Sequence, residues 1–136
     1  MSGDVNFIPV PAANVRHVWH RIRHGLESTI AKVGSRGMPE DVFVDLMKGD
    51  SYLYLITPGG FGIFQQRRDV DGLVLHVFAF WMPEFMQHKD EVLAGLDQLA
   101  RDCGAIRVTT SGRKGWGRVG FKEVSRNFER ELVNRA

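Results

Sequence analysis

The sequence predicts a single α+β domain on a mixed sheet: an antiparallel meander, a right-handed strand–helix–strand crossover and a C-terminal hairpin. The apolar run at residues 73–81 is typical of a strand buried on both faces. An apolar stripe at helical spacing follows it and stops at Gly104. Residues 105–110 then have the composition of a second strand, and a crossover of this length makes the two strands parallel.

The N-terminal third is predicted to form an edge strand and two helices. Two prolines within residues 7–11 suit an edge strand better than a central one. We expect Asn14 to cap the first helix, Gly25 to kink it, and Pro39 and Gly49 to open and close the second. The residues expected to face the core are Val15, Val18, Trp19, Ile22, Leu26 and Ile30 of the first helix, and Val42, Phe43, Leu46 and Met47 of the second.

The other side of the first helix is basic. His20 and His24 are four residues apart and could share a metal ion, but no nearby carboxylate or cysteine completes a site. Neighbouring arginines would also repel a cation, so we expect a solvated basic face and no metal. This face comprises Arg16, His17, His20, Arg21, Arg23 and His24.

The middle of the chain is predicted to be a three-stranded meander. Residues 51–57 alternate aromatic and aliphatic side chains, which favours a strand. Pro58-Gly59-Gly60 turns the chain into a strand at residues 61–67, and the segment 69–72 turns it again into the strand at 73–81.

The crossover helix is expected to begin at Pro83, whose missing N–H costs nothing in a first helical turn. Its predicted apolar stripe is Phe85, Lys89, Val92, Leu96, Leu99 and Cys103, broadened by Met86, Leu93 and Ala100. After the crossover, residues 111–120 contain four glycines and are expected to be a loop with one short helical turn. Residues 121–125 and 128–133 alternate apolar with charged residues and are predicted to be two half-exposed strands.

Composition limits the classes of function. The chain has 136 residues, 43% of them hydrophobic, which suits one globular domain over residues 1–136. A formal net charge of +2 makes nucleic-acid binding an unfavoured prediction. The single cysteine, Cys103, excludes an internal disulfide, fits a reducing compartment and is expected to be a small buried hydrophobe. No signal peptide or membrane-spanning run is visible, so we expect a soluble protein.

The order of predicted elements, together with Gly120-Phe121-Lys122-Glu123-Val124 and the closing Phe128-Glu129-Arg130-Glu131-Leu132, resembles the GNAT (Gcn5-related N-acetyltransferase) family. The resemblance covers nearly the whole chain in topology. In overall likeness it is similar to the small GNAT-like proteins of tailed bacteriophages, some of which are carried in the virion. The resemblance implies a GNAT-like domain located in a virion or in the host cytoplasm.

The family resemblance also implies where acetyl-coenzyme A would bind. In active members, a glycine-rich loop after the strand at 73–81 holds the pyrophosphate on successive backbone N–H groups at a helix N-terminus. Here that position contains no glycine: Pro83 lacks a donor, Glu84 is negative, and Phe85 and Met86 are bulky. The family positions that would contact a coenzyme, if one binds, are Phe85, Met86, Gln87 and His88, with Arg113 and Lys114 as further cations.

The catalytic positions that the family implies also depart from its pattern. Many members place a tyrosine four residues before the Gly-Phe pair, where its hydroxyl protonates the departing thiolate. Trp116 stands there, and an indole N–H is too weak an acid for that step. A general base could come from His76, or from Asp69 or Asp71, although a lone histidine in a strand is more often structural.

We therefore predict a non-catalytic GNAT-like protein with no cofactor, which binds a protein partner or forms part of a virion. The alternative is an active N-acetyltransferase that binds acetyl-CoA in a different way, using Arg113, Lys114, His88 and Lys89. A third alternative is nucleic-acid binding through arginines of the first helix or of the glycine-rich loop.

Overall fold

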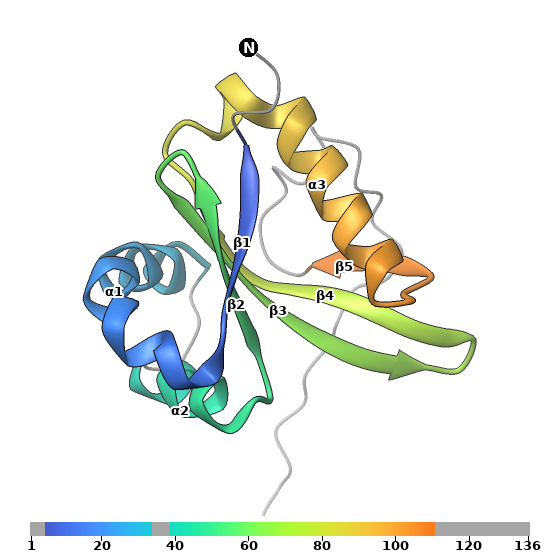
Figure 1. Ribbon diagram of the computed structural model, residues 1–136, viewed down its shortest axis with the longest axis horizontal. Coiled ribbons are helices and arrows are strands. Elements are labelled where there is room, and N and C mark those ends of the chain that lie inside the picture. Colours follow the sequence, from blue (N-terminus) through green and yellow to red (C-terminus); the bar gives the residue numbers. More distant parts are fainter. Residues whose placement is uncertain (1–4, 34–38, 111–136) are drawn as a thin grey trace, which may run out of the picture.

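The computed structural model describes residues 5–33 and 39–110, and Figure 1 draws the other residues as a thin grey trace. The predicted loop at residues 111–120 and the two predicted strands at 121–125 and 128–133 lie outside the described residues. The predicted core position Ile30 belongs to the first helix, but its side chain is likewise not described.

Five strands form one mixed sheet in the order β1-β2-β3-β4-β5. Neighbouring strands from β1 to β4 pair antiparallel, and β4 pairs parallel with β5. The predicted edge strand, meander and parallel crossover are all confirmed. The strands are β1 (Asn6–Val10), β2 (Tyr52–Thr57), β3 (Gly60–Asp69), β4 (Gly72–Trp81) and β5 (Arg107–Thr110).

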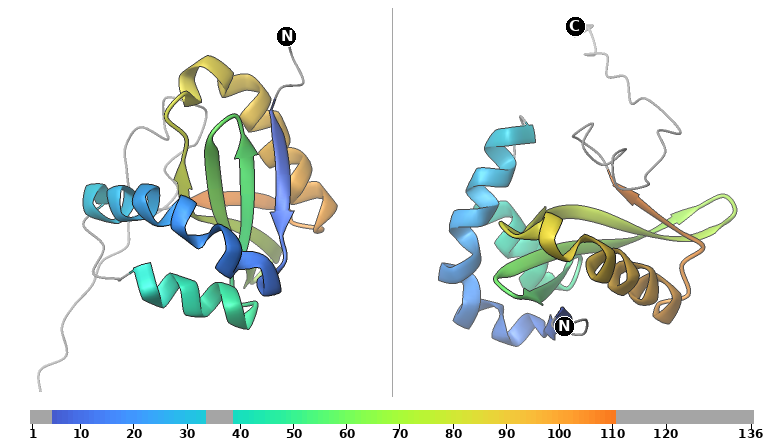
Figure 2. Two further views of the ribbon diagram at one scale, coloured as in Figure 1. Left: turned by 60° about the vertical axis from the view of Figure 1, so that its left-hand side comes forward. Right: turned by 90° about the horizontal axis from the view of Figure 1, so that it is seen from above.

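The helices cover the two faces of the sheet separately. Helices α1 (Val15–Val33) and α2 (Pro39–Lys48) lie on one face, and α3 (Lys89–Asp102) lies on the other (Figures 1 and 2). Short 3₁₀ helices precede α1 (η1, Ala12–Asn14) and α3 (η2, Phe85–His88). No helix in the described ranges is long and apolar enough to cross a bilayer.

Each face of the sheet has its own hydrophobic core. On the α1/α2 face, the apolar sides of both helices pack on β2, β3 and the end of β4, as their periodicity predicts. Its buried members include Val15, Ile22, Leu26, Val42, Leu46, Leu53, Phe61 and Ile63. On the α3 face, the buried members of the cores are Phe64, Leu75, Val77, Leu96 and Ala100, with Ile56, Met82 and Val92 beside them.

Two predicted helix features need correction. Asn14 does not cap α1, because a 3₁₀ turn begins earlier and the Asn14 N–H donates to the Pro11 carbonyl at 2.8 Å. Helix α1 continues through Gly25, which lies in close contact with β4: a Cβ there would lie 2.6 Å from Trp81 Cδ2. The α-helix of the crossover begins at Lys89 and not at Pro83, because the preceding residues form the tighter η2 turn.

The glycines predicted to end the other two helices are confirmed. Gly49 follows α2 with φ of +81°, and Gly104 follows α3 with φ of +79°. Both values lie in the left-handed region that glycine enters without a Cβ penalty. The Ala105 N–H then donates to the Ala100 carbonyl at 2.9 Å, which closes the end of α3.

Strand β4 contains a one-residue bulge at Phe78. Ile63 of β3 pairs with Ala79, whereas the next residue, Phe64, pairs with Val77, so Phe78 has no partner in the register. Leu75 and Val77 therefore belong to the α3 core, while Ala79, also an odd-numbered residue, belongs to the α1/α2 core.

Candidate functional site

The junction between β4 and α3 folds as a tight turn that uses its own amides. The Phe85 N–H donates to the Met82 carbonyl and the Gln87 N–H donates to the Glu84 carbonyl, each at 3.1 Å. The sequence dictates this turn, because Pro83 has no N–H to offer and the buried Met82 side chain anchors the strand end. Two of the amides at the predicted cofactor positions are therefore engaged within the turn.

The charge around the start of α3 is mainly negative. Asp90 and Glu91 occupy the first turn of α3, and Glu84 precedes η2. The His88 ring lies between two of these carboxylates, with Nε2 4.0 Å from Glu84 and Nδ1 3.8 Å from Glu91. Acidic side chains at a helix N-terminus stabilise the helix by interacting with its dipole, and they also repel a phosphate.

The side chains at the predicted cofactor positions differ in their surroundings. The Phe85 ring is half-buried and meets the Phe80 ring edge to face, with centroids 5.8 Å apart. Met86 is 70% exposed, so its predicted place on the apolar stripe of the helix is wrong. Gln87 is exposed, and Arg113 and Lys114 lie outside the described residues. Phe85 thus acts as a hydrophobic anchor of the turn.

His76 lies in the middle of β4, between β3 and β5, on the face opposite α3. It pairs in register with Gln65 of β3 and Thr109 of β5, and only 5% of its surface is exposed. Its Nδ1 atom lies 2.9 Å from the Thr109 hydroxyl oxygen. Burial, aided by the positive charge of Arg67, lowers the pKa of His76 to about 4. The imidazole is therefore neutral at pH 7.

The sequence did not reveal a chain of polar side chains on the same face. The Arg67 guanidinium donates to Gln65 Oε1 at 2.8 Å, and Gln65 Nε2 donates to the Ser51 hydroxyl at 3.1 Å. Ser51, which immediately precedes β2, is buried, with 4% of its surface exposed. The one sequence feature that indicated this chain was the spacing of Gln65 and Arg67, which lie two residues apart in β3 and so share a face. Trp116, the other candidate catalytic residue, lies outside the described residues.

The described residues contain a parallel pairing of β4 with β5 that reaches Thr110, the last residue of the described range. It covers Val74 to Val77 of β4, and the Thr110 hydroxyl donates to the Val77 carbonyl at 3.2 Å at the end of this pairing. Strand β4 continues to Trp81, four residues beyond the register with β5. The Phe78 bulge directly follows Val77, the last residue of β4 that has a described partner on β5.

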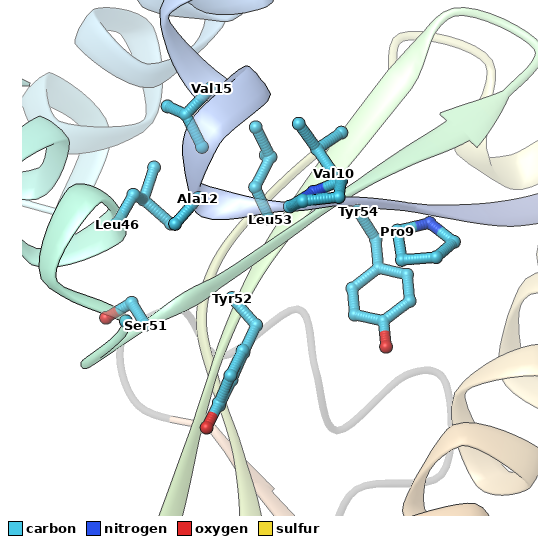
Figure 3. Close-up of a pocket in the computed structure, with 11 residues that line it drawn as sticks. Pro9, Val10, Ala12, Val15, Leu46, Ser51, Tyr52, Leu53 and Tyr54 are labelled. Atoms are coloured by element: carbon cyan, nitrogen blue, oxygen red, sulfur yellow. The ribbon is translucent and has the colours of Figure 1, made fainter.

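Two surface cavities lie elsewhere. One of about 280 Å³ lies where β1, β2 and the end of α2 meet; its wall includes Pro9, Leu46 and Tyr52 (Figure 3). A larger one of about 440 Å³ lies between α1 and the ends of β1 to β4, with Arg21, Phe61 and Trp81 in its wall. The described residues contain no cluster of three or more metal-ligating side chains, and His20 and His24 are both exposed on α1.

Cys103 and the two aspartates named as candidate bases fall at structural positions. Cys103 is half-buried, and its Sγ donates to the Ala100 carbonyl at 3.3 Å. Asp69 and Asp71, the other candidate bases, both bind the Arg107 guanidinium, at 3.4 Å in the case of Asp69. Their ion pairs tie the β3–β4 turn to β5, on the solvent-exposed surface.

Comparison with known proteins shows the fold. No protein-family model and no curated protein matches the sequence. Solved structures do match: a probable acetyltransferase has a TM-score of 0.67 and 16% identity, over 96% of this chain and 99% of that one. A GNAT family acetyltransferase from Staphylococcus aureus matches with a TM-score of 0.65 and 13% identity, over 95% and 99% of the two chains.

A third match is an aminoglycoside acetyltransferase from an uncultured soil metagenomic sample. It has a TM-score of 0.65 and 11% identity, over 96% of this chain and 97% of that one. The chain therefore has a GNAT-like fold, as predicted. Sequence identities this low support a shared fold but do not show a shared activity.

Proposed function

We propose that this chain is a GNAT-like domain that does not use acetyl-CoA and serves instead as a protein-binding or structural component. The observation that carries the proposal is the β4–α3 junction, where the Phe85 and Gln87 amides donate to the carbonyls of their own turn. A pyrophosphate is held in such folds by backbone N–H groups that point outward at a helix N-terminus. Amides already engaged within a turn are not available for that contact.

Electrostatics supports the same conclusion. Three carboxylates, those of Glu84, Asp90 and Glu91, surround the start of α3, against one permanent cation, Lys89, and the ring of His88. A coenzyme pyrophosphate would bring further negative charge to this place, where like charges repel. The setting expected from the sequence, a phage particle or a phage protein that contacts its host, is part of this proposal.

The direct test is a titration of the full chain with acetyl-CoA and with CoA, followed by calorimetry and thermal unfolding. We expect no heat of binding and no change in the melting temperature. A ligand at 100 times its dissociation constant would stabilise the fold by about 2.7 kcal/mol, which such a scan detects. A dose-dependent rise in melting temperature, saturating with either ligand, would contradict the proposal.

A matched variant separates the two reasons for exclusion. In a chain carrying Glu84→Gln, Asp90→Asn and Glu91→Gln, the repelling charges are gone but the turn hydrogen bonds remain. We expect this variant also to ignore acetyl-CoA, because the amides are still engaged. A GNAT acetyltransferase titrated in parallel provides the positive control.

The second candidate function is acetyl transfer with an altered coenzyme site. The observation that favours it is His76, whose imidazole on β4 is neutral at pH 7 and so has a ring nitrogen that can act as a base, although a pKa of about 4 makes it a weak one. Its test is release of free CoA thiol from acetyl-CoA in the presence of polyamines or amino-terminal peptides. Turnover that is lost in His76→Gln would favour this candidate over the binding domain.

A further inference from the structure

One face of α1 is basic along its first half, as the sequence predicts. Residues 15–26 contain no acidic residue, and the first turn of α1 has none either. Arg16 and His17 stand in that first turn, where the helix dipole disfavours positive charge. The exposed members of this basic face are Arg16, His17, His20, Arg21, Arg23 and His24.

The arginines of this face are not equivalent. Arg23 is already neutralised, because it binds Glu27 at 3.0 Å and Glu40 at 2.7 Å. Arg16 and Arg21 form no ion pair or hydrogen bond with any part of the chain that the structure describes. Two guanidinium groups are therefore presented to solvent on a helix that gains no stability from them.

Arg21 also borders an apolar cavity. It is the one charged residue among the described residues that line the 440 Å³ cavity between α1 and the ends of β1 to β4. Ile8 forms part of the rim and is 46% exposed, although it is a large aliphatic residue. His17 and His24 are neighbours of Arg21 at helical spacing, so the basic face continues from the rim of the cavity.

The wall of this cavity is closely packed against α1. The rings of Phe61 and Trp81 stack with centroids 5.9 Å apart, and both lie against Gly25 of α1, where a Cβ would come within 2.8 Å of either ring. A preformed apolar hollow beside unpaired cations presents two kinds of contact at once: burial for an apolar side chain, and charge-assisted hydrogen bonds for carboxylates.

We infer that the basic face of α1 and the adjoining cavity form a docking surface for an acidic protein segment that carries a bulky apolar side chain at its centre. The apolar side chain enters the cavity against Phe61 and Trp81, and carboxylates on either side of it bind Arg21 and Arg16. This inference rests on the proposed role as a protein-binding domain and gives that role a surface and a partner of defined chemistry.

Charge arithmetic favours an acidic protein segment over a nucleic acid. Non-specific nucleic-acid binding draws its affinity from several phosphate contacts made by permanent cations. Arg23 is neutralised by two glutamates, which leaves two unpaired arginines on this face, and the whole chain has a net charge of only +2. An apolar cavity adds nothing to phosphate binding, whereas it suits a leucine or phenylalanine side chain.

The test is fluorescence anisotropy of the full chain with the labelled peptide Asp-Glu-Asp-Leu-Phe-Asp-Glu-Asp. Two control peptides carry lysine at the acidic positions or Gly-Ser in place of Leu-Phe. We expect the acidic apolar peptide to bind and both controls to bind at least about tenfold more weakly. No binding of the acidic apolar peptide at about 1 mM would overturn the inference.

Protein variants locate the binding. Arg21→Glu is expected to lower the affinity for the acidic apolar peptide about tenfold or more. Arg68→Glu makes the same charge change on the exposed part of β3 and is expected to leave this affinity within about twofold of the parent value. Ile8→Ser should weaken the Leu-Phe peptide and leave the Gly-Ser peptide unchanged. Equal losses in Arg21→Glu and Arg68→Glu would overturn the inference, because binding would then follow net charge alone.

Two further outcomes are distinguishable. Preferential binding of a single-stranded thymidine oligonucleotide, lost in Arg21→Glu, would replace the acidic protein segment by a nucleic acid and overturn the inference. Coenzyme binding does not enter this assay. A chain that binds both acetyl-CoA and the peptide would therefore refute the non-catalytic proposal while leaving the docking surface in place.

Discussion

His76 of β4 and Thr109 of β5 are partners in the parallel register, and the imidazole Nδ1 lies 2.9 Å from the threonine hydroxyl. The contact joins the two parallel strands of the crossover on the face opposite α3. Because His76 is buried, a protonated ring would hold its positive charge out of contact with water. This cost lowers the pKa of His76 from an ordinary 6.5 to about 4.

We predict that this histidine makes the fold sensitive to acid. The folded state holds a neutral ring, so above pH 6.5 neither state is protonated and stability is unaffected. As the pH falls from 6.5 to about 4, the unfolded chain binds a proton that the folded chain does not, and stability is lost. The loss is at most about 1.4 kcal/mol per pH unit.

Urea unfolding at pH 7 and at pH 4.5 measures this loss. In His76→Gln the part due to this ring should vanish, whereas the exposed His20→Gln should keep the full loss of the parent chain. A parent and a His76→Gln variant with identical pH dependence would show that His76 is not the group responsible.

We predict that Gly25→Ala destabilises the fold even though alanine favours a helix. A Cβ at this position would lie 2.6 Å from Trp81 Cδ2 and 2.8 Å from Phe61 Cε1, closer than packed atoms tolerate. Overpacking of this kind costs about 1–3 kcal/mol, against a gain of up to about 1 kcal/mol in helix propensity. Chemical denaturation measures the difference. In a Trp81→Leu background the cost of Gly25→Ala should shrink, and undiminished destabilisation there would contradict the proposed contact.

We predict that alanine substitutions at two adjacent residues of η2 change the free energy of unfolding by different amounts. Phe85→Ala should lower the free energy of unfolding by roughly 1–3 kcal/mol, because the ring packs against Phe80 and the core beside α3. Met86→Ala should change it by less than about 0.5 kcal/mol, because Met86 is 70% exposed. Thermal or urea unfolding of the pair decides. Equal effects would mean that the turn is arranged differently.

We predict that Arg107 restrains the start of β5. Its guanidinium binds Asp69 and Asp71 in the β3–β4 turn, and the pair with Asp71 lowers the pKa of that carboxyl. The Ile106 N–H next to it donates to the Leu73 carbonyl at 2.8 Å. In Arg107→Ala, hydrogen exchange at Ile106 should accelerate, whereas Arg101→Ala on the exposed end of α3 should leave it unchanged. Unaltered exchange in Arg107→Ala would exclude this restraint.

The order of strands and helices could be predicted because glycine and proline residues mark the boundaries between them. Gly49, Gly104 and the Pro58-Gly59-Gly60 turn separate segments whose apolar spacing is clearly helical or clearly extended. The start of α3 could not be placed in the same way. Phe85 and Met86 fit a 3.6-residue stripe as well as they fit a 3₁₀ turn, and hydrogen bonding to the Met82 carbonyl decides between the two.

The candidate sites were visible only in part. A glycine-free junction at Pro83 could be seen directly in the sequence, but not the engagement of the Phe85 and Gln87 amides, which depends on the turn geometry. The cavity beside Arg21 joins residues from α1, β1, β2, β3 and β4, so no local pattern indicates it. The Ser51–Gln65 hydrogen bond, likewise, links residues 14 positions apart.

The extra residue at Phe78 decides which layer each later side chain of β4 enters. With strict alternation, Ala79 and Trp81 would follow Leu75 and Val77 beneath α3, and Phe80 would turn toward α1. The inserted residue resets the parity of the strand, so Trp81 reaches Gly25 and forms the floor of the hollow beside Arg21. Deleting Phe78 would make Val77 and Ala79 direct neighbours on the opposite faces that they already occupy, so both layers would keep their side chains and only the bulge would be lost.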